Sequence, residues 1–274
     1  MISETANVSS LFPSRGNWTR EQLKLAFYLY CQLPFGRLHR RNQAIVDLAG
    51  LIGRSPDALA MKLVNFASLD PAITRSGRSG LSGASRLDRE VWDEFHADWE
   101  ELASECAQLM TALRERLLGE DDQHRDDAEE DSLDLADHTG QTRVVLTHQR
   151  IKQQFFRRAV LSSYHGRCCM SGLSETQLLV AGHIVPWRSD TRNRLNPRNG
   201  LCLSAIHDRA FDRGLVALTD DLRVIVSDRL LSQNDEITTR IFRPLLGQQI
   251  ELPEKFAPDP TFIRMHRECC FLGG

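Results

Sequence analysis

The chain has 274 residues, with 34 basic and 37 acidic side chains, a formal net charge of −3 and a pI near 6.3. It has no apolar run of bilayer-spanning length, no Walker loop and no dinucleotide glycine fingerprint, which argues against a membrane protein and against a nucleotide cofactor. The cysteine count is odd, seven, and no signal peptide is evident, so we expect a cytoplasmic protein without a disulfide framework.

The charges are distributed in blocks. Residues 1–90 hold 12 Lys and Arg against 7 Asp and Glu, and residues 143–274 hold 19 against 13. Between them, residues 119–142 hold one basic and ten acidic side chains and almost no large apolar ones, so this stretch cannot bury enough surface to order itself. We therefore predict a domain at 1–118, an acidic flexible linker at 119–142 and a second domain at 143–274.

The first domain is predicted to be helical. Thr19 and Gln22 form a capping box, and apolar residues at helical spacing follow them. A second helical pattern ends near Gly53, and Ser55 with Pro56 supplies the N-cap and the first-turn proline of a third helix. Three helices with a short turn between the last two indicate a helix-turn-helix or winged-helix-like domain, whose recognition helix enters the DNA major groove.

Several side chains of this domain are candidates for DNA binding. The polar face of the third helix would present Lys62 together with Asp57 and Asn65. A segment rich in serine, glycine and arginine follows, and its Arg75 and Arg78 would grip phosphate as a wing does. The alternative is that the three helices form only a packed core and that the arginine segment is only a surface loop.

Residues 91–118 are predicted to form one long acidic amphipathic helix. Trp92, Phe95, Trp99 and Leu102 recur at helical spacing and mark the stripe that would be buried. We expect this helix to pack on the first domain or to pair with a partner chain.

The second domain contains two short apolar runs that predict strands. The first ends at His183 and is stopped by Pro186, and the second runs from Leu201 to Ile206, after which the pattern becomes helical at His207. The loop between the two strands carries four arginines, and a guanidinium matches a phosphate with a forked pair of donors. These candidate phosphate contacts are Arg188, Arg192, Arg194 and Arg198.

A second hairpin is predicted beyond His207. Two runs of alternating apolar residues flank Asp220 and Asp221, which is a hairpin signal. We expect this hairpin to support the first one.

His183, Asn199 and His207 together suggest phosphodiester hydrolysis, which needs a base, a cation and a group that orients the base. Single histidines and asparagines more often cap strands or satisfy buried hydrogen bonds. Here, however, they lie within four ordered motifs, at 167–172, 182–187, 196–201 and 207–214. With these motifs the chain resembles the HNH, or ββα-metal, endonuclease family over about residues 155–229.

The resemblance implies a role for each residue. His183 would be the general base, Asn199 would orient it or help at the metal, and His207 would ligate one divalent cation, Mg²⁺ or Mn²⁺. Many members carry Asp or His directly before the base, where this chain has Gly182, so Asn199, waters and substrate phosphate oxygens are expected to complete the ligand set. Asp212 lies about 140° around a helix from His207 and is expected to hydrogen-bond locally instead.

The cysteines do not predict a structural zinc ion, although some relatives hold one with paired Cys-x-x-Cys motifs. Cys168 and Cys169 are adjacent, and Ser171 stands where the second ligand of such a motif would be. Cys269 and Cys270 are also adjacent, which suits tetrahedral ligation poorly.

The sequence therefore predicts an α+β protein with an amino-terminal helical, DNA-reading domain and a carboxy-terminal ββα-metal domain. The expected function is metal-dependent DNA cleavage of a restriction type, with dependence on modified bases as a further refinement. One site cuts one strand, so a homodimer would suit a double-strand break. Two alternatives remain: a DNA-binding regulator with an inactive HNH domain, and a defence nuclease whose amino-terminal domain binds a ligand other than DNA.

Overall fold

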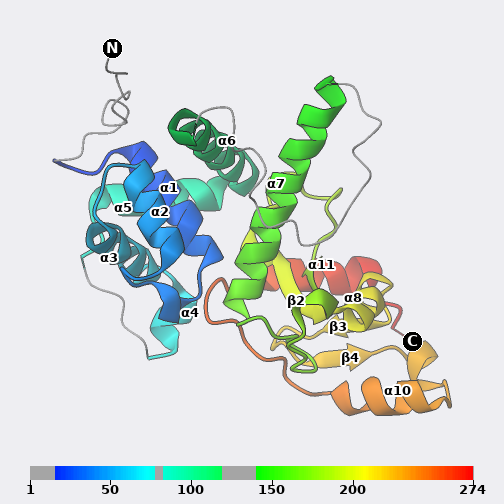
Figure 1. The fold of residues 1–274 in the computed structure, drawn as a ribbon. Helices are drawn as coiled ribbons and strands as arrows, with labels where there is room; N and C mark the ends of the chain where they lie inside the picture. The colour runs from blue at the N-terminus through cyan, green and yellow to red at the C-terminus, as the bar shows by residue number, and fades with distance from the viewer. Residues whose placement is uncertain (1–15, 78–82, 119–139, 274) are drawn as a thin grey trace.

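A computed structural model describes residues 16–77, 83–118 and 140–273. It combines an amino-terminal helical half with a carboxy-terminal half built on two small antiparallel hairpins, which is an α+β arrangement (Figure 1). Buried side chains of both halves belong to one continuous hydrophobic cluster. No helix in the described ranges combines the length and the apolar composition that crossing a bilayer requires.

The helical half is organised around its first helix. The predicted capping box of Thr19 and Gln22 is present at the start of this helix, and Ser55 caps the third helix as expected. The ring of Phe27 lies at the centre of the half, with the rings of Phe66 and Phe95 at 5.1 and 4.6 Å between centroids. The elements are α1 (Arg20–Gln32), the 3-10 helix η2 (Phe35–Arg37), α2 (Gln43–Leu51), α3 (Pro56–Ala67), α4 (Pro71–Arg75), α5 (Arg86–Ala97) and α6 (Trp99–Leu118).

The prediction of one long helix over 91–118 is wrong, because the chain breaks between α5 and α6. Asp98 leaves the helical conformation, with φ −152° and ψ 92°, and its carboxylate accepts a hydrogen bond from the Glu101 N–H at 3.0 Å. Aspartate is a preferred N-cap residue, so Asp98 ends one helix and begins the next. The bend leaves both Phe95 and Trp99 fully buried.

The carboxy-terminal half contains the strands that the sequence predicted. The first ends at His183 as expected, and the second begins one residue and ends two residues earlier than expected. The hairpin predicted around Asp220 and Asp221 is confirmed. The elements are α7 (Gly140–Ser163), η4 (Thr176–Leu178), β1 (Leu179–His183), η5 (Pro197–Asn199), β2 (Gly200–Ser204), α8 (Ala205–Asp212), β3 (Val216–Leu218), β4 (Val224–Val226), α9 (Asp228–Leu231), α10 (Glu236–Ile241), η6 (Arg243–Leu245) and α11 (Pro260–Cys270).

The β1–β2 hairpin lies between α7 and α8. His183 pairs with Gly200 in the antiparallel register, and a Cβ atom on Gly200 would collide with Val160 of α7. A Cβ atom on Gly182, whose side points to the other face, would instead collide with Asp208 of α8. Two glycines therefore allow the two helices to approach the hairpin from opposite faces.

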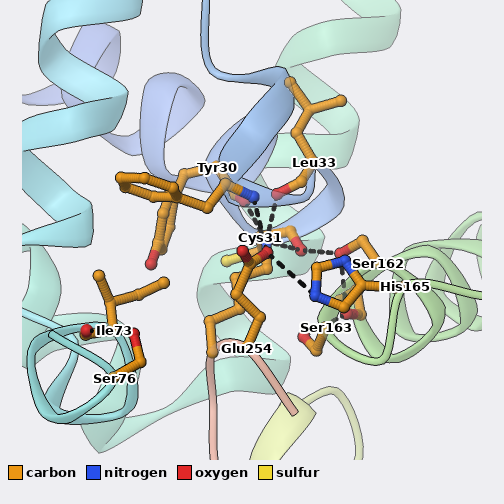
Figure 2. A network of polar contacts seen from close by, with 12 residues as sticks. Tyr30, Cys31, Leu33, Ile73, Ser76, Ser162, Ser163, His165 and Glu254 are labelled. Atoms are coloured by element: carbon orange, nitrogen blue, oxygen red, sulfur yellow. Dashed lines mark hydrogen bonds and ion pairs between the residues drawn. The ribbon is translucent and has the colours of Figure 1, made fainter. Parts of the chain in front are cut away.

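Residues 251–259 connect the two halves of the molecule. The buried ammonium group of Lys255 donates to the carbonyl oxygens of Tyr30, Cys31 and Leu33 at 2.6, 2.8 and 2.6 Å, at the carboxyl end of α1. Glu254 accepts from the backbone N–H of Phe35 at 2.9 Å. Figure 2 shows Tyr30, Cys31 and Leu33, whose carbonyl groups accept these hydrogen bonds, next to Glu254. The end of α1 is thus held by side chains more than 200 positions away in the sequence.

One buried and one partly buried histidine make stability depend on pH. Burial lowers the pKa of His96 and His266 below the ordinary value of 6.5. The unfolded chain then binds more protons than the folded one as the pH falls through 6.5, so the free energy of unfolding should decrease from about pH 7 to about pH 5. In urea titrations across this range, the double variant His96→Phe/His266→Phe should show a shallower decrease than wild type. Equal slopes would contradict this assignment.

Candidate active site

His183 is held in one orientation at the end of β1. Its ring stacks on Phe156 of α7, with centroids 4.0 Å apart and planes 7° apart, and meets the edge of Trp187 at 5.3 Å. Its Nε2 donates to the carbonyl oxygen of Arg194 at 2.9 Å. Because a carbonyl can only accept, the neutral imidazole must carry its proton on Nε2, and Nδ1 keeps a free lone pair.

The surroundings of His183 favour its neutral form. Burial lowers the pKa of His183 below its ordinary value, against the opposing effects of the Arg194 carbonyl and the charge of Asp212. A neutral imidazole with a free nitrogen is the form that can accept a proton from water.

His183 also opens onto a pocket of about 380 Å³ at the surface of the hairpin. A cation stands at this pocket, since Arg157 is fixed there by hydrogen bonds to the carbonyls of Leu179 and Thr176, at 2.7 and 3.0 Å. The remaining lining residues are Gln153, Phe156, Val180, Ala181 and Trp187. The base therefore faces a concave surface that carries a positive charge.

Asn199 connects the two chain segments that flank the base. Its Oδ1 accepts from the Val185 N–H at 2.8 Å, and its Nδ2 donates to the carbonyls of Val185 and Asn193 at 3.2 and 3.3 Å. The side chain is 1% exposed. Asn199 thus fixes the backbone that follows β1 and the loop that carries Arg194, the partner of His183.

His207 lies in the first turn of α8 and has its own set of neighbours. Its Nδ1 is 2.8 Å from the Ser204 hydroxyl and 3.5 Å from the sulfur of Cys168, and its ring meets Phe242 edge-on at 5.8 Å. The residue is 2% exposed, and its Nε2 has no hydrogen-bond partner among the described residues. None of these contacts is shared with His183, so the two predicted imidazoles have different neighbours.

The neighbours of His207 form a small polar cluster with a regular spacing. Cys168 and Ser171 are three positions apart, and so are Ser204 and His207. Burial raises the pKa of the Cys168 thiol, but hydrogen bonds from His207 and Ser171 outweigh it and lower the pKa to about 6. This is the ligand spacing of a zinc knuckle, with serine hydroxyls at two positions where zinc sites have thiolates or imidazoles.

Asp208 and Asp212 were not among the predicted site residues. They lie four positions apart and thus on one face of α8, and an oxygen of Asp208 fills the space beside Gly182. Burial and the charge of Asp212 raise the pKa of Asp208 to about 6. The local hydrogen bond expected for Asp212 is not seen in the described part of the chain, and its charge acts on Asp208 and His183 instead. The sequence signal for this pair was the four-residue spacing of the two aspartates.

The four arginines of the loop between β1 and β2 divide into two kinds. Arg188 and Arg192 are exposed. Arg194 donates from Nε to the Trp187 carbonyl at 2.8 Å, and Arg198 forms an ion pair of 3.1 Å with the N-cap aspartate of α11. Two arginines therefore face solvent next to the base, and two hold the loop in place.

Two of the candidate DNA-binding side chains in the helical half are engaged in contacts within the protein. Lys62 forms an ion pair of 2.8 Å with the fully buried carboxylate of Asp88, and the amide of Asn65 donates to the carbonyl of Gly83. These inward contacts do not leave α3 the free polar face that a recognition helix needs. Arg75 is exposed at the end of α4, and Arg78 lies outside the described residues.

A family model described as HNH endonuclease matches residues 168–219, and no curated protein matches the chain. The matched segment contains the Cys168 cluster, both strands of the β1–β2 hairpin and α8. This segment is thus similar to HNH endonuclease domains, which supports a nuclease in general terms.

Proposed function

We propose that this protein is a metal-dependent endonuclease that hydrolyses phosphodiester bonds in DNA, with His183 as its general base. The observation that carries the proposal is the hydrogen bond from His183 to the Arg194 carbonyl, inside the HNH segment and at the edge of a pocket. It leaves an unprotonated ring nitrogen on a neutral imidazole, which is what activation of water requires.

Each neighbour contributes to this step. Phe156 and Trp187 hold the plane of the imidazole, and Asn199 fixes the loop whose Arg194 carbonyl sets the tautomer. His183 then removes a proton from the water that attacks phosphorus. HNH domains generally use divalent cations, and Mg²⁺ or Mn²⁺ would neutralise the charge that develops on the phosphate and on the leaving oxygen.

The residues present can accommodate such a cation. No group of three or more His, Cys, Asp or Glu side chains in the described ranges is arranged to hold a metal ion. Magnesium at phosphate sites is nevertheless commonly held by one or two carboxylates, with waters and phosphate oxygens completing its shell. The Asp208 carboxylate, in the space left by Gly182, meets that requirement.

The exposed arginines would bind the DNA backbone. Arg188 and Arg192 lie in the loop next to His183, and Arg157 stands at the pocket. Binding through such contacts should weaken steeply as salt rises, because each phosphate contact releases condensed counterions.

The biological role that we propose is restriction of DNA, with a preference set by base modification. The helical half, including the exposed Arg75, would contribute to recognition, and pairing of two chains would allow cleavage of both strands. The observation that favours this role is the combination of a nuclease segment with a separate helical half in one molecule.

A plasmid assay tests the proposal. Supercoiled plasmid incubated with the protein and Mg²⁺ or Mn²⁺ should become nicked or linear, and EDTA should prevent this. Plasmids that differ only in methylation should be cut at different rates if recognition depends on modification. A protein that leaves every plasmid intact with both cations would refute the nuclease assignment, and equal rates on all plasmids would refute only the dependence on modification.

A further inference from the structure

We propose that Asp208 of α8 replaces the side chain missing at Gly182 and is the protein's carboxylate ligand for the divalent cation. This inference rests on the proposed function and names a residue outside the trio that the sequence indicated.

Gly182 and the carboxylate of Asp208 share one space. Residues alternate between the faces of a strand, so the side of Gly182 faces α8 while His183 faces α7. A Cβ atom on Gly182 would collide with an oxygen of Asp208 and would lie 3.4 Å from Leu203. In many HNH enzymes the residue directly before the base supplies a metal ligand from the strand. Here α8 places the Asp208 carboxylate at that position instead.

α8 carries two carboxylates whose chemistry suits a divalent cation. Asp208 is partly buried and has no hydrogen-bond or ion-pair partner among the described residues, while Asp212 lies one helical turn away on the same face. Repulsion between Asp208 and Asp212 exceeds the attraction of Asp208 to the neighbouring Arg209, and a partly desolvated charge is costly. Carboxylate oxygens are the ligands that Mg²⁺ and Mn²⁺ prefer, so a divalent cation would relieve both costs.

The two other candidate ligands, His207 and Asn199, have different surroundings. His207 is enclosed by Ser204, Cys168 and Phe242, away from the contacts of His183. Asn199 already uses its amide group to bind backbone groups. His207 keeps a free Nε2 but faces Ser204, Cys168 and Phe242, whereas the carboxylate of Asp208 lies directly beside the strand of the base.

Binding of Mn²⁺ to the full chain without DNA tests the inference. In isothermal titration calorimetry, with electron paramagnetic resonance of free Mn²⁺ as a second readout, Asp208→Asn should weaken binding at least tenfold. His207→Gln should leave the affinity within about threefold of wild type if the protein remains folded. Thermal melting in EDTA monitors folding, and Asp208→Asn should melt no lower than wild type because it removes a partly buried charge.

A positional swap adds a second test. Gly182→Asp/Asp208→Ala supplies a carboxylate from the strand instead of the helix, and it should bind Mn²⁺ more tightly than Asp208→Ala alone. Equal binding by these two variants would contradict a shared position.

The outcomes separate this inference from the proposed function. Unchanged Mn²⁺ affinity in Asp208→Asn, or loss of binding in a folded His207→Gln variant, would overturn the assignment of Asp208 even if plasmid is cut. Loss of Mn²⁺ binding in Asp208→Asn by a protein that cuts no plasmid would support the ligand assignment and reject the nuclease.

Discussion

Replacing His183 with alanine should slow plasmid nicking at least about 100-fold, since a positioned general base contributes roughly 10²- to 10⁴-fold to rate. The variant loses the imidazole that is stacked on Phe156 and fixed by the Arg194 carbonyl. Nicking is measured as the initial rate of conversion of supercoiled plasmid at saturating Mg²⁺ or Mn²⁺.

Two controls sharpen this experiment. His39→Ala changes an exposed histidine of the helical half and should nick at the wild-type rate. Mn²⁺ binding by His183→Ala should stay close to that of wild type, because the base and the proposed carboxylate lie on opposite faces of β1. If His183→Ala nicks as fast as wild type, water is activated by another group.

Replacing Lys255 with methionine should lower the free energy of unfolding by about 3 kcal/mol or more. Lys255 is fully buried, and its ammonium group satisfies three carbonyl oxygens at the end of α1. Methionine has a similar length but no donor, so these carbonyls would stay buried without partners. The favourable interaction between a cation and the carboxyl end of a helix would be lost as well.

Urea unfolding gives the measurement, with Arg240→Met as the matched control. Arg240 forms an exposed ion pair with Glu236 one turn away, and such pairs contribute about 0.5 kcal/mol or less. Similar stabilities for Lys255→Met and Arg240→Met would show that the contacts of Lys255 do not hold the two halves together.

The predicted strands, caps and hairpins depend on neighbours in sequence, which is why the sequence revealed them. Pro186 after an apolar run ends β1, Ser55 caps α3, and alternating residues around Asp220 form the second hairpin. His183 and Asn199 were recognisable because their motifs are short and contiguous. The break at Asp98 was missed because the apolar stripe continues across it.

The partners of charged and polar side chains could not be predicted from neighbouring residues in the sequence. Lys62 was expected to face DNA, but Asp88, 26 positions later, draws it inward. The contacts of Lys255 with α1 span more than 220 positions. A periodic pattern tells which face of a helix is apolar, but it does not tell which distant group a polar side chain will meet.

By itself, the sequence determined the elements around His183 and the chemical nature of the residues there, because strand periodicity, caps and turn residues act over a few positions. Only the tertiary structure decided that His207 turns toward Cys168 and that Asp208 fills the space beside Gly182. These two neighbours on α8 point to different surroundings because successive side chains on a helix are about 100° apart. Which of them meets the strand is fixed by how α8 packs on the hairpin.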